Sequence, residues 1–298
     1  MVDLTIILLN YNTSDLTQEC LASIYKYQPK CSFEVMVVDN ASSDDSVKEI
    51  KSNFPKVRLV SNDKNLGFSK GNNVGIKKVY KNSKYCLLLN SDTTVLSGSL
   101  TNLYGHAEKE GCDICSCKLV NKSGRFQANG GALPTFLHLF VWISGLDDIF
   151  GKYMPVVPYQ GKNLDHFSGG KVGWVSGTAM MIKSKVFDQI GFLDEKIFMY
   201  GEDAEFCLRA KRSNLSVCWT KEAEIVHLGG GSLTTPKYNQ WLGEFRGLIY
   251  IYNKYYGAFA ASLLRILINF FVLLRIIAFG LLGKFSYAKT YAQIIFKI

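Results

Sequence analysis

The sequence predicts an α/β fold in which helices pack on one mainly parallel central sheet. Four short apolar runs, each typical of a buried strand, alternate with stretches of helical periodicity over the first ninety residues; they lie at 5–9, 33–38, 57–60 and 85–89. Alternation of this kind favours parallel strands joined by right-handed crossovers. Polar clusters follow three of the runs, at 10–12, 39–40 and 90–92. In such a sheet these clusters should converge on one crevice at the carboxyl ends of the strands.

The segments between the runs carry helix signals. Residues 13–14 supply a capping hydroxyl, and the apolar side chains that follow recur every three or four positions. Residues 42–44 open a second helix in the same way. A polar, glycine-rich loop at 65–73 then leads into a third helix that extends through Val79.

The net charge of +9 belongs to one end of the chain. From Arg246 onward there are seven Lys and Arg and no Asp or Glu, which leaves 27 basic and 25 acidic residues before it. The basic stretch is also strongly apolar, and this combination indicates a membrane surface as the partner and argues against a nucleic acid.

The apolar stretch at 257–283 predicts a membrane-associated helix. At about 100° per residue, its polar side chains Ser262, Arg265, Asn269 and Arg275 fall within a sector of about 140°. A polar stripe on so apolar a helix fits one that lies in the interface, with the arginines reaching anionic head groups. A kinked or re-entrant insertion is the alternative. An internal core helix is disfavoured because two arginines would need buried partners.

Cys112, Cys115 and Cys117 form a C-x2-C-x-C cluster, but no second Cys/His pair stands at zinc-finger spacing. The surrounding residues 113–120 alternate like a strand, so we interpret these cysteines as strand residues instead of zinc ligands. The first residues show no basic and apolar leader pattern. We therefore expect a protein at the cytoplasmic face of the cell membrane, attached peripherally, with reduced thiols.

Two strand tips carry the first candidate ligands. No G-x-G-x-x-G or G-x-x-x-x-G-K-[ST] pattern occurs, so a nucleotide would be held without those glycine turns. Asp39 is placed to accept hydrogen bonds from a ribose or a base imide, although an Asx turn explains it equally well. Asp92 is placed to hold a divalent cation, whereas the alternative is a polar turn in which Asn90 and Asp92 bond their own backbone.

The second half of the chain offers two further candidates. Asp203 stands at the start of a predicted helix, in line with its buried side, which suits either an N-cap or a catalytic base at the wall of a cleft. His227 ends a short apolar strand just before three glycines whose backbone N–H groups could approach a pyrophosphate. The apolar segment 137–149 is expected in the core, with a surface for a lipid-linked acceptor as the alternative.

Several of these segments together resemble the family 2 inverting glycosyltransferases, within them the bacterial rhamnosyltransferase-like branch. The similar segments are Val37 to Asp44, Asn65 to Phe68 with Gly71 to Asn73, and Leu88 to Asp92, in matching order and spacing. The resemblance covers about residues 3–250. It implies the GT-A fold, in which a Rossmann-like nucleotide-binding half is fused to an acceptor-binding half, here with C-terminal membrane-associated helices added.

The resemblance also implies roles for individual residues. The family's DxD metal motif appears as Asn90-Ser91-Asp92, so only Asp92 carries over with its acid as a ligand of Mg2+ or Mn2+. Glu202-Asp203 matches the family's ED motif, which makes Asp203 the catalytic base. His227 completes the metal shell in several relatives with a similar segment. The donor-binding residues would be Asn12, Asp39, Asn65, Asn90 and Asp92.

The expected activity is metal-dependent transfer of a hexose, with rhamnose as the expected sugar, from dTDP-rhamnose or a UDP-hexose to a hydroxyl of a cell-surface polysaccharide or of a lipid-linked glycan precursor. The expected division is a nucleotide-sugar half at 1–95, an acceptor-binding and catalytic half at 96–250, and a membrane-associating tail at 251–298. Two other classes stay open. One is a hydrolase that uses the same cation with water as acceptor, and the other is a non-catalytic sugar-nucleotide-binding subunit.

Overall fold

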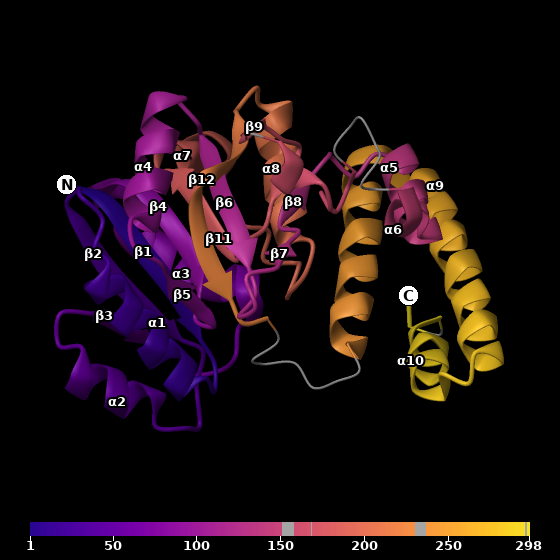
Figure 1. Ribbon diagram of the computed structural model, residues 1–298, viewed down its shortest axis with the longest axis horizontal. Coiled ribbons are helices and arrows are strands. Elements are labelled where there is room, and N and C mark those ends of the chain that lie inside the picture. The colour runs from indigo at the N-terminus through magenta and orange to yellow at the C-terminus, as the bar shows by residue number, and fades with distance from the viewer. Residues whose placement is uncertain (151–157, 168, 230–236, 296) are drawn as a thin grey trace.

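The computed structural model describes residues 1–150, 158–167, 169–229, 237–295 and 297–298, and consists of an α/β body beside a group of C-terminal helices (Figure 1). Its strands are β1 (Val2–Asn10), β2 (Phe33–Asp39), β3 (Arg58–Ser61), β4 (Ser83–Asn90), β5 (Thr93–Val95), β6 (Ile114–Val120), β7 (Phe126–Gln127), β8 (Gly130–Gly131), β9 (Gly169–Lys171), β10 (Trp174–Val175), β11 (Ala179–Lys183) and β12 (Val217–His227). Its helices are α1 (Ser14–Lys26), α2 (Ser46–Asn53), α3 (Gly67–Val79), η1 (Tyr80–Asn82), α4 (Ser99–Lys109), α5 (Phe136–Ser144), α6 (Leu146–Phe150), η3 (Leu164–His166), α7 (Lys185–Ile190), α8 (Glu202–Arg212), α9 (Tyr238–Leu281) and α10 (Phe285–Ile295).

The main sheet has the order β3-β2-β1-β4-β11-β6-β12-β5, with β7 added to β6 and β9 to β12. The four strands predicted from the apolar runs are β1 to β4, and each is parallel to its neighbour. β11 enters antiparallel between β4 and β6, and β6 and β12 are again parallel. The predicted α/β fold with a mainly parallel sheet is confirmed.

Both faces of the central strands are buried, which explains why these strands read as continuous apolar runs. Side chains of one face, such as Ile7 and Leu88, pack against α3 and the elements of the second half. Those of the other face, such as Leu8 and Leu87, pack against the side that carries α1 and α4. The sheet is therefore covered by helices on both sides, as Figure 1 shows.

The register of the parallel strands brings their polar ends together. Asn10 pairs with Asp39, and Leu9 pairs with Asn90 across the other edge of β1. The polar clusters at 10–12, 39–40 and 90–92 thus lie together at the carboxyl ends of the parallel strands, as the alternation of strands and helices predicts.

The C-terminal helix α9 is bent into two arms. Gly257 has φ 87° and ψ 169°, which is outside the helical region, so residues 238–256 form an inner arm and 258–281 an outer arm. Figure 1 shows the two arms side by side, with the inner arm next to the α/β body and α10 between the arms at their open end. By length and composition α9 could cross a membrane, and it is the only helix of the described residues for which this holds.

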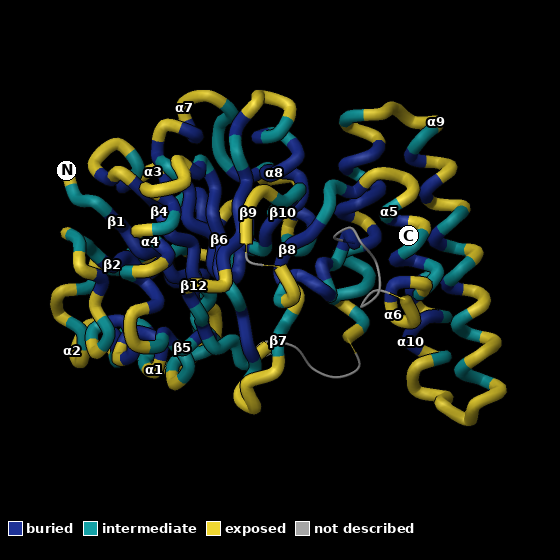
Figure 2. The backbone as a smooth tube through the Cα atoms, turned by 45° about the horizontal axis from the view of Figure 1, so that its top comes forward, coloured by how far each residue is buried: buried dark blue, intermediate teal, exposed yellow. Residues whose placement is uncertain are grey.

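The outer arm faces away from the body with apolar side chains. Ile266 is 66% and Phe270 54% exposed, and Figure 2 shows this arm largely exposed while the strands of the body are buried. Part of the predicted polar stripe points inward, because the Arg275 Nη2 donates to the carbonyl of Ile143 at 2.6 Å. Contrary to the expectation that Arg275 reaches anionic head groups, this side chain turns toward α5, whose Ile143 carbonyl supplies the partner that an inward arginine needs.

The segment 137–149 is divided between the two expected environments. Leu139, Trp142 and Ile143 are buried in the core, as predicted. Leu137 and Ile149 are exposed on the side of α5 and α6 that turns away from the core. The exposed side of α5 contacts the outer arm of α9, because the Phe140 and Phe271 rings lie 5.8 Å apart. This helix therefore links the body to the apolar surface of the outer arm.

Two cysteines differ from the expectation of reduced thiols. Cys112 and Cys218 form a disulfide, with Cα atoms 6.1 Å apart, because β6 and β12 are neighbouring parallel strands. Cys115 and Cys117 lie on β6 with free sulfurs, so the predicted strand in this segment is confirmed. The pairing partner Cys218 stands 106 residues from Cys112, which no local spacing could indicate.

Candidate functional site

Asp39 organises the crevice at the tips of β1 and β2. Its Oδ1 accepts a hydrogen bond from Asn10 Nδ2 at 2.7 Å, and its Oδ2 accepts one from the Ser42 N–H at 3.0 Å. Asn10 is itself held by the hydroxyls of Thr13 and Thr17. Asp39 is only 1% exposed, so this carboxylate fixes the shape of the loop that follows β2.

Asn12 and Asn65 flank this corner on either side. Asn12 has φ 53°, a conformation that asparagine tolerates better than most residues, and its Oδ1 accepts from the Ser43 N–H at 2.7 Å. Asn65 Oδ1 accepts from the Gly67 N–H at 2.9 Å and from Asn40 Nδ2 at 3.3 Å. The structure thus brings Asn12, Asp39 and Asn65 to one edge of the sheet, each with a bond that shapes the neighbouring loop.

Asp92 and His227 meet at the tip of β4. The Asp92 Oδ1 lies 3.4 Å from His227 Nε2, and the Leu228 N–H donates to the Asp92 carbonyl at 2.9 Å. This proximity follows from the pairing of β12 with β5, in which His227 stands opposite Thr93. Both side chains are partly exposed, so a ligand can reach them from solvent.

The partner on the other side of the His227 ring determines what Nε2 can bind. Gln127 donates its Nε2 to the His227 carbonyl at 3.1 Å, which turns its Oε1 toward His227 Nδ1 at 2.9 Å. An amide oxygen only accepts, so Nδ1 carries the proton. In the neutral ring, Nε2 then presents a lone pair to the Asp92 carboxylate. A carboxylate oxygen and a lone pair on Nε2 repel each other unless a second proton on the ring or a cation lies between them. The Asp92–His227 pair therefore suits a divalent cation, with Gln127 orienting the histidine from the side away from the ion.

Asp203 lies at the first turn of α8, as the sequence predicts. Its Oδ2 accepts a hydrogen bond from the Gly177 N–H at 3.2 Å, and its Oδ1 accepts from the Ala204 N–H at 2.7 Å. The next residue, Thr178, accepts from the Asn90 N–H at 2.9 Å. Segment 177–178 therefore contacts both the tip of β4 and the start of α8, and this brings Asp92 and Asp203 into one region although 110 residues separate them.

Three carboxyl groups gather around the start of α8. Burial raises the pKa of Asp203, although the N–H groups of Gly177 and Ala204 act against this. Burial and the Asp203 charge also raise the pKa of Glu202. The same two causes raise the pKa of Glu244, on the inner arm of α9, to about 8. Burial around the start of α8 thus favours the protonated form of all three carboxyl groups.

Tyr200 lies near Asp92 and near the start of α8. Burial raises its pKa to about 12, and the charges of Glu202, Glu244 and Asp92 add to this effect. The charges of Asp92, Glu202 and Glu244 thus act on the same phenol, so Asp92 and the carboxyl groups at the start of α8 lie near one side chain. Tyr200 has φ 72°, an unfavourable conformation for a bulky residue that marks the tight turn before α8.

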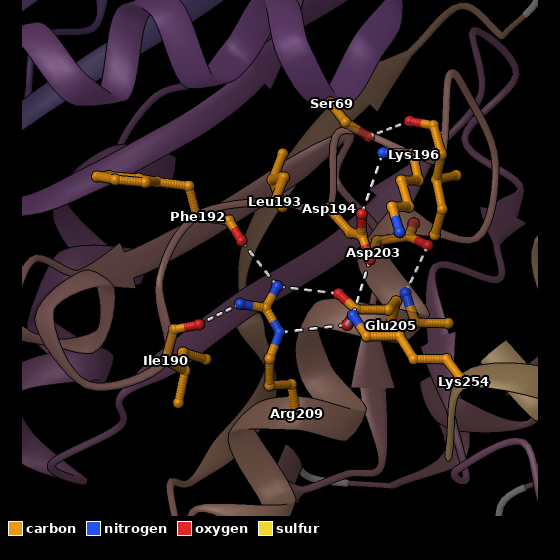
Figure 3. Close-up of polar contacts among 12 residues, drawn as sticks. Ser69, Ile190, Phe192, Leu193, Asp194, Lys196, Asp203, Glu205, Arg209 and Lys254 are labelled. Carbon is orange, nitrogen blue, oxygen red and sulfur yellow. Dashed lines mark hydrogen bonds and ion pairs between the residues drawn. The ribbon is translucent and has the colours of Figure 1, made fainter. Parts of the chain in front are cut away.

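The position of Asp203 depends on an ion-pair network behind it. Glu205 is fully buried two residues after Asp203 on α8, and its carboxylate accepts from Arg209 Nη2 at 2.9 Å and from Lys254 Nζ at 2.7 Å (Figure 3). Lys254 also donates to Asp194 Oδ2 at 2.7 Å. Although burial opposes it, hydrogen bonds from Lys254 and Tyr250 lower the pKa of Asp194 to about 2. The network ties α8 to the loop before it and to the inner arm of α9.

The glycine-rich segment 65–73 has a structural task that the sequence did not indicate. Ser69 Oγ donates to the Ile197 carbonyl at 2.6 Å, and the Phe68 N–H donates to the Phe198 carbonyl at 2.7 Å. A Cβ at Gly67 would lie 2.5 Å from that same carbonyl oxygen. This segment thus anchors the loop that leads to Asp203.

The inner arm of α9 closes the site from the other side. A Cβ at Gly247 would lie 2.5 Å from the Tyr200 carbonyl oxygen, so only glycine allows the arm to approach the turn before α8. Glu244, three residues before, accepts a hydrogen bond from Gln160 Nε2 at 2.7 Å. The arm that begins the C-terminal region is therefore also a wall of the candidate site.

Sequence reasoning missed Gln127, Thr178 and Glu244. Each acts through a partner far along the chain, so no local motif marks it. Of the three glycines after His227, Gly230 and Gly231 lie outside the described residues, and the predicted approach of their N–H groups to a pyrophosphate stays a prediction.

The chain is similar to known proteins over most of its length. The model of Glycosyl transferase family 2 matches residues 5–191. The low-salt glycan biosynthesis hexosyltransferase Agl10 of Haloferax volcanii is 30% identical over 227 residues, which cover 76% of this chain and 67% of that protein. The N-acetylglucosaminyl-diphospho-decaprenol L-rhamnosyltransferase of Mycobacterium tuberculosis is 22% identical and covers 75% of each chain. The dTDP-rhamnosyl transferase RfbF of Shigella flexneri is 23% identical over 66% of this chain and 60% of its own.

Solved structures share the fold. GalNAc-T7, crystallised with UDP, GalNAc and Mn2+, superposes with a TM-score of 0.60 at 14% identity over 85% of this chain. Staphylococcus aureus TarS superposes with a TM-score of 0.55 at 16% identity over 91% of this chain. This chain spans 48% and 43% of those two proteins. At these identities the similarity concerns the fold alone, and it confirms the expected GT-A architecture.

Proposed function

The chain belongs to glycosyl transferase family 2, and from this premise we propose that it transfers a hexose from a nucleoside-diphosphate sugar to a glycan hydroxyl with inversion at the anomeric carbon. The observation that carries the proposal is that segment 177–178 bonds both to Asp203 and to Asn90, two residues before Asp92, so that two acidic groups of the site lie near one another. We call them the two acidic corners. One corner, Asp92 with His227, suits a cation beside a diphosphate. The other corner, with Asp203, suits removal of a proton.

Asp203 is the catalytic base in this proposal. The acceptor oxygen forms a bond to the anomeric carbon while the bond from that carbon to the diphosphate oxygen breaks, and the acceptor proton goes to the Asp203 carboxylate. A base is most effective when its pKa lies near the working pH, and burial moves the pKa of Asp203 in that direction. The N–H groups of Gly177 and Ala204 keep the carboxylate oriented.

Asp92 and His227 would hold Mg2+ or Mn2+, and the remaining donor contacts follow from the strand tips. A cation bound there would stabilise the negative charge that develops on the departing diphosphate. Asn90 lies beside Asp92 at the diphosphate end. We assign the nucleoside end to Asn12, Asp39 and Asn65, within the half formed by residues 1–95, and acceptor binding to residues 96–250.

The printed names of the relatives support a donor and an acceptor class. Two of them are rhamnosyltransferases, and one is named for a decaprenol-linked acceptor. We propose dTDP-rhamnose as the donor, with a UDP-hexose as the alternative, and a lipid-linked glycan precursor as the acceptor. The exposed apolar surface of α5 and the outer arm supports an acceptor that resides in a lipid layer.

A direct assay tests this function. The purified chain is incubated with each nucleotide sugar, Mn2+ and a polyprenyl-diphosphate-linked sugar, while release of nucleoside diphosphate and the anomeric configuration of the product are measured. We expect release that requires both acceptor and cation, and a product inverted at the anomeric carbon. Equal sugar release without acceptor would indicate a hydrolase. Binding of the nucleotide sugar with no release from any donor would indicate a non-catalytic subunit.

We further propose that the outer arm of α9 rests on the cytoplasmic face of the cell membrane. Its outward side chains, among them Phe259, Ile266 and Phe270, form a continuous apolar surface on a very apolar helix. Between the two arms, a hollow of about 520 Å³ is lined by Arg246, Arg265 and other residues. These cations suit the phosphates of anionic lipids at the edge of that surface.

A substitution on the outer face tests the membrane proposal. Replacing Phe270 by Glu removes an exposed ring that would enter the lipid layer and puts a charge in its place, so partition onto anionic vesicles should fall at least about tenfold. Ser52→Glu, on exposed α2, adds the same charge far from this surface and should leave partition unchanged. Vesicle co-sedimentation measures both variants. Equal loss in both would mean that net charge, and not the apolar face, controls binding.

A further inference from the structure

A second group of metal-ligand side chains lies at the end of the sheet opposite the candidate cleft. A ring nitrogen of His106, on α4, lies within 4.8 Å of the sulfurs of Cys112 and Cys115, which in turn are within 4.8 Å of each other. Cys218, near the start of β12, is bonded to Cys112 and stands opposite Cys115 in the strand register. His227 ends the same strand nine residues later, roughly 30 Å away along an extended chain. The proposed transfer reaction uses none of these four residues.

The His106 ring is poised as a ligand. Its side chain is 10% exposed, and its Nδ1 lies 3.6 Å from Glu222 Oε2. Its Nε2 is buried and has no hydrogen-bond partner among the described residues. A buried ring nitrogen without a partner is unfavourable, so this atom calls for a ligand. A carboxylate that faces the other nitrogen is the usual outer contact of a metal-bound histidine.

The disulfide accounts for only part of this cluster. It pairs Cys112 with Cys218, but it involves neither the Cys115 sulfur, which donates to the Ser116 carbonyl, nor the buried His106 Nε2. The helix itself is held in place independently, because Asn102 Nδ2 donates to the Glu222 carbonyl at 2.8 Å. The ring therefore faces the sulfurs as a consequence of the fold and not of a bond to any of them.

We propose that His106, Cys112, Cys115 and Cys218 of the reduced chain bind one zinc ion in a tetrahedral Cys3His site that joins α4 to β6 and β12. At zinc distances of about 2.3 Å to sulfur and 2.0 Å to nitrogen, tetrahedral ligand atoms stand roughly 3.5–4 Å apart. Three of the proposed ligands already lie within 4.8 Å of one another, and Cys218, which is bonded to Cys112, is released as the fourth when the disulfide opens. The disulfide is the oxidised, metal-free form. A dithiol reductant opens it by becoming a disulfide itself, which gives two Cys thiols, and zinc then displaces the protons of the three thiols into water.

The experiment measures zinc in the full-length chain purified under reducing conditions and dialysed against metal-free buffer. We expect one equivalent of zinc per chain, released when a mercurial reagent blocks the thiols. His106→Gln and Cys115→Ser should reduce the bound zinc to near zero. Cys86→Ser, which alters another buried free cysteine on β4, should keep it. Asp92→Ala should also keep it, which separates this site from the cleft and makes the result independent of transferase activity.

Cobalt(II) provides a readout that does not depend on how well the variants fold. The wild-type chain loaded with cobalt should show the visible bands of a tetrahedral ion and a thiolate charge-transfer band in the near ultraviolet. A reduced wild-type chain that binds no zinc, or that binds cobalt without a thiolate band, would overturn the proposal. Zinc bound equally by the wild type, His106→Gln and Cys115→Ser would overturn it as well, because the ligands would then lie elsewhere.

Discussion

The two acidic corners of the cleft are built in opposite ways. At the tip of β4, Asp92 is partly exposed and faces the ring of His227, which Gln127 holds from behind. At the start of α8, Asp203 lies among buried carboxyl groups, and burial raises the pKa values of Asp203 and Glu244. The first corner keeps its charge in reach of solvent and of a cation, whereas the second makes charge costly. Residue type alone does not separate these roles, since an aspartate stands at each corner and only its surroundings differ.

The base corner should show the largest effect. Asp203→Asn keeps the size of the side chain and removes its ability to take the acceptor proton, so kcat should fall by roughly 10²–10⁴. Donor affinity should stay within about twofold, because the substitution leaves the Asp92 corner intact. Turnover and calorimetric titration of the nucleotide sugar measure the two quantities. Asp188→Asn, on exposed α7, is the control, and near-normal turnover of Asp203→Asn would remove the base assignment.

A substitution at Asp92 should first weaken binding of the cation and the nucleoside diphosphate, and should affect kcat only as a consequence. Asp92→Ala removes a carboxylate ligand, and the Mn2+-dependent part of nucleoside-diphosphate affinity should fall on the order of 100-fold or more. Calorimetry with and without Mn2+ measures this part directly. Asp15→Ala changes an exposed acid on α1 and should have no effect. Unchanged metal dependence in Asp92→Ala would show that the two corners do not divide their roles as proposed.

Gln127 sharpens the comparison because it acts only through His227. Gln127→Ala removes the acceptor that keeps the proton on Nδ1, so Mn2+ affinity should weaken about 10–100-fold. At saturating Mn2+, kcat should return close to that of the unchanged chain, which a general loss of folding would not allow. Titration of Mn2+ by electron paramagnetic resonance measures the affinity, with Gln28→Ala as the exposed control. An unaltered affinity would mean that Nε2 does not contact the cation.

The smallest effect concerns stability and pH. Burial and the Asp203 charge raise the pKa of Glu244 from 4.5 to about 8, so the folded chain keeps a proton that the unfolded chain releases. The stability that this supplies is complete below pH 4.5 and is lost as the pH rises to 8. Glu244→Gln cannot ionise, so the fall in Tm between pH 4.5 and 8 should become smaller by about 2–4 °C. Scanning calorimetry in EDTA measures it, and parallel curves for both chains would contradict the raised pKa.

The elements that sequence reasoning located are those with local signals. The apolar runs of β1 to β4 end in polar tips, and the buried side of α8 places Asp203 in line with the core, so the positions of Asp39, Asp92 and Asp203 follow from short windows. Contacts between distant segments leave no such trace. Glu244 approaches Asp203 only because Gly247 allows the inner arm against Tyr200, and Cys218 meets Cys112 only because β12 lies beside β6.

The tail shows the same limit in a different form. Its composition predicts an apolar helix with a polar stripe, but not the direction in which that stripe faces. The bend at Gly257 folds the outer arm back along the inner one, so Arg275 turns toward α5 and the apolar side chains turn outward. The orientation of an amphipathic helix depends on what it packs against, and that information lies outside the helix.

The bend at Gly257 also sets the reach that an acceptor needs. The inner arm lies beside the candidate site through Glu244 while the outer arm faces away from it, so two helices, each about 10 Å thick, separate the proposed catalytic base from whatever the outer arm rests on. If that support is a bilayer, an acceptor hydroxyl directly at the lipid head group would lie about 20 Å from the proposed catalytic base, too far to react. A carrier that already holds a diphosphate and one or more sugars would span the gap, so the thickness of this helical layer acts as a ruler for how far a growing glycan must extend before it is used.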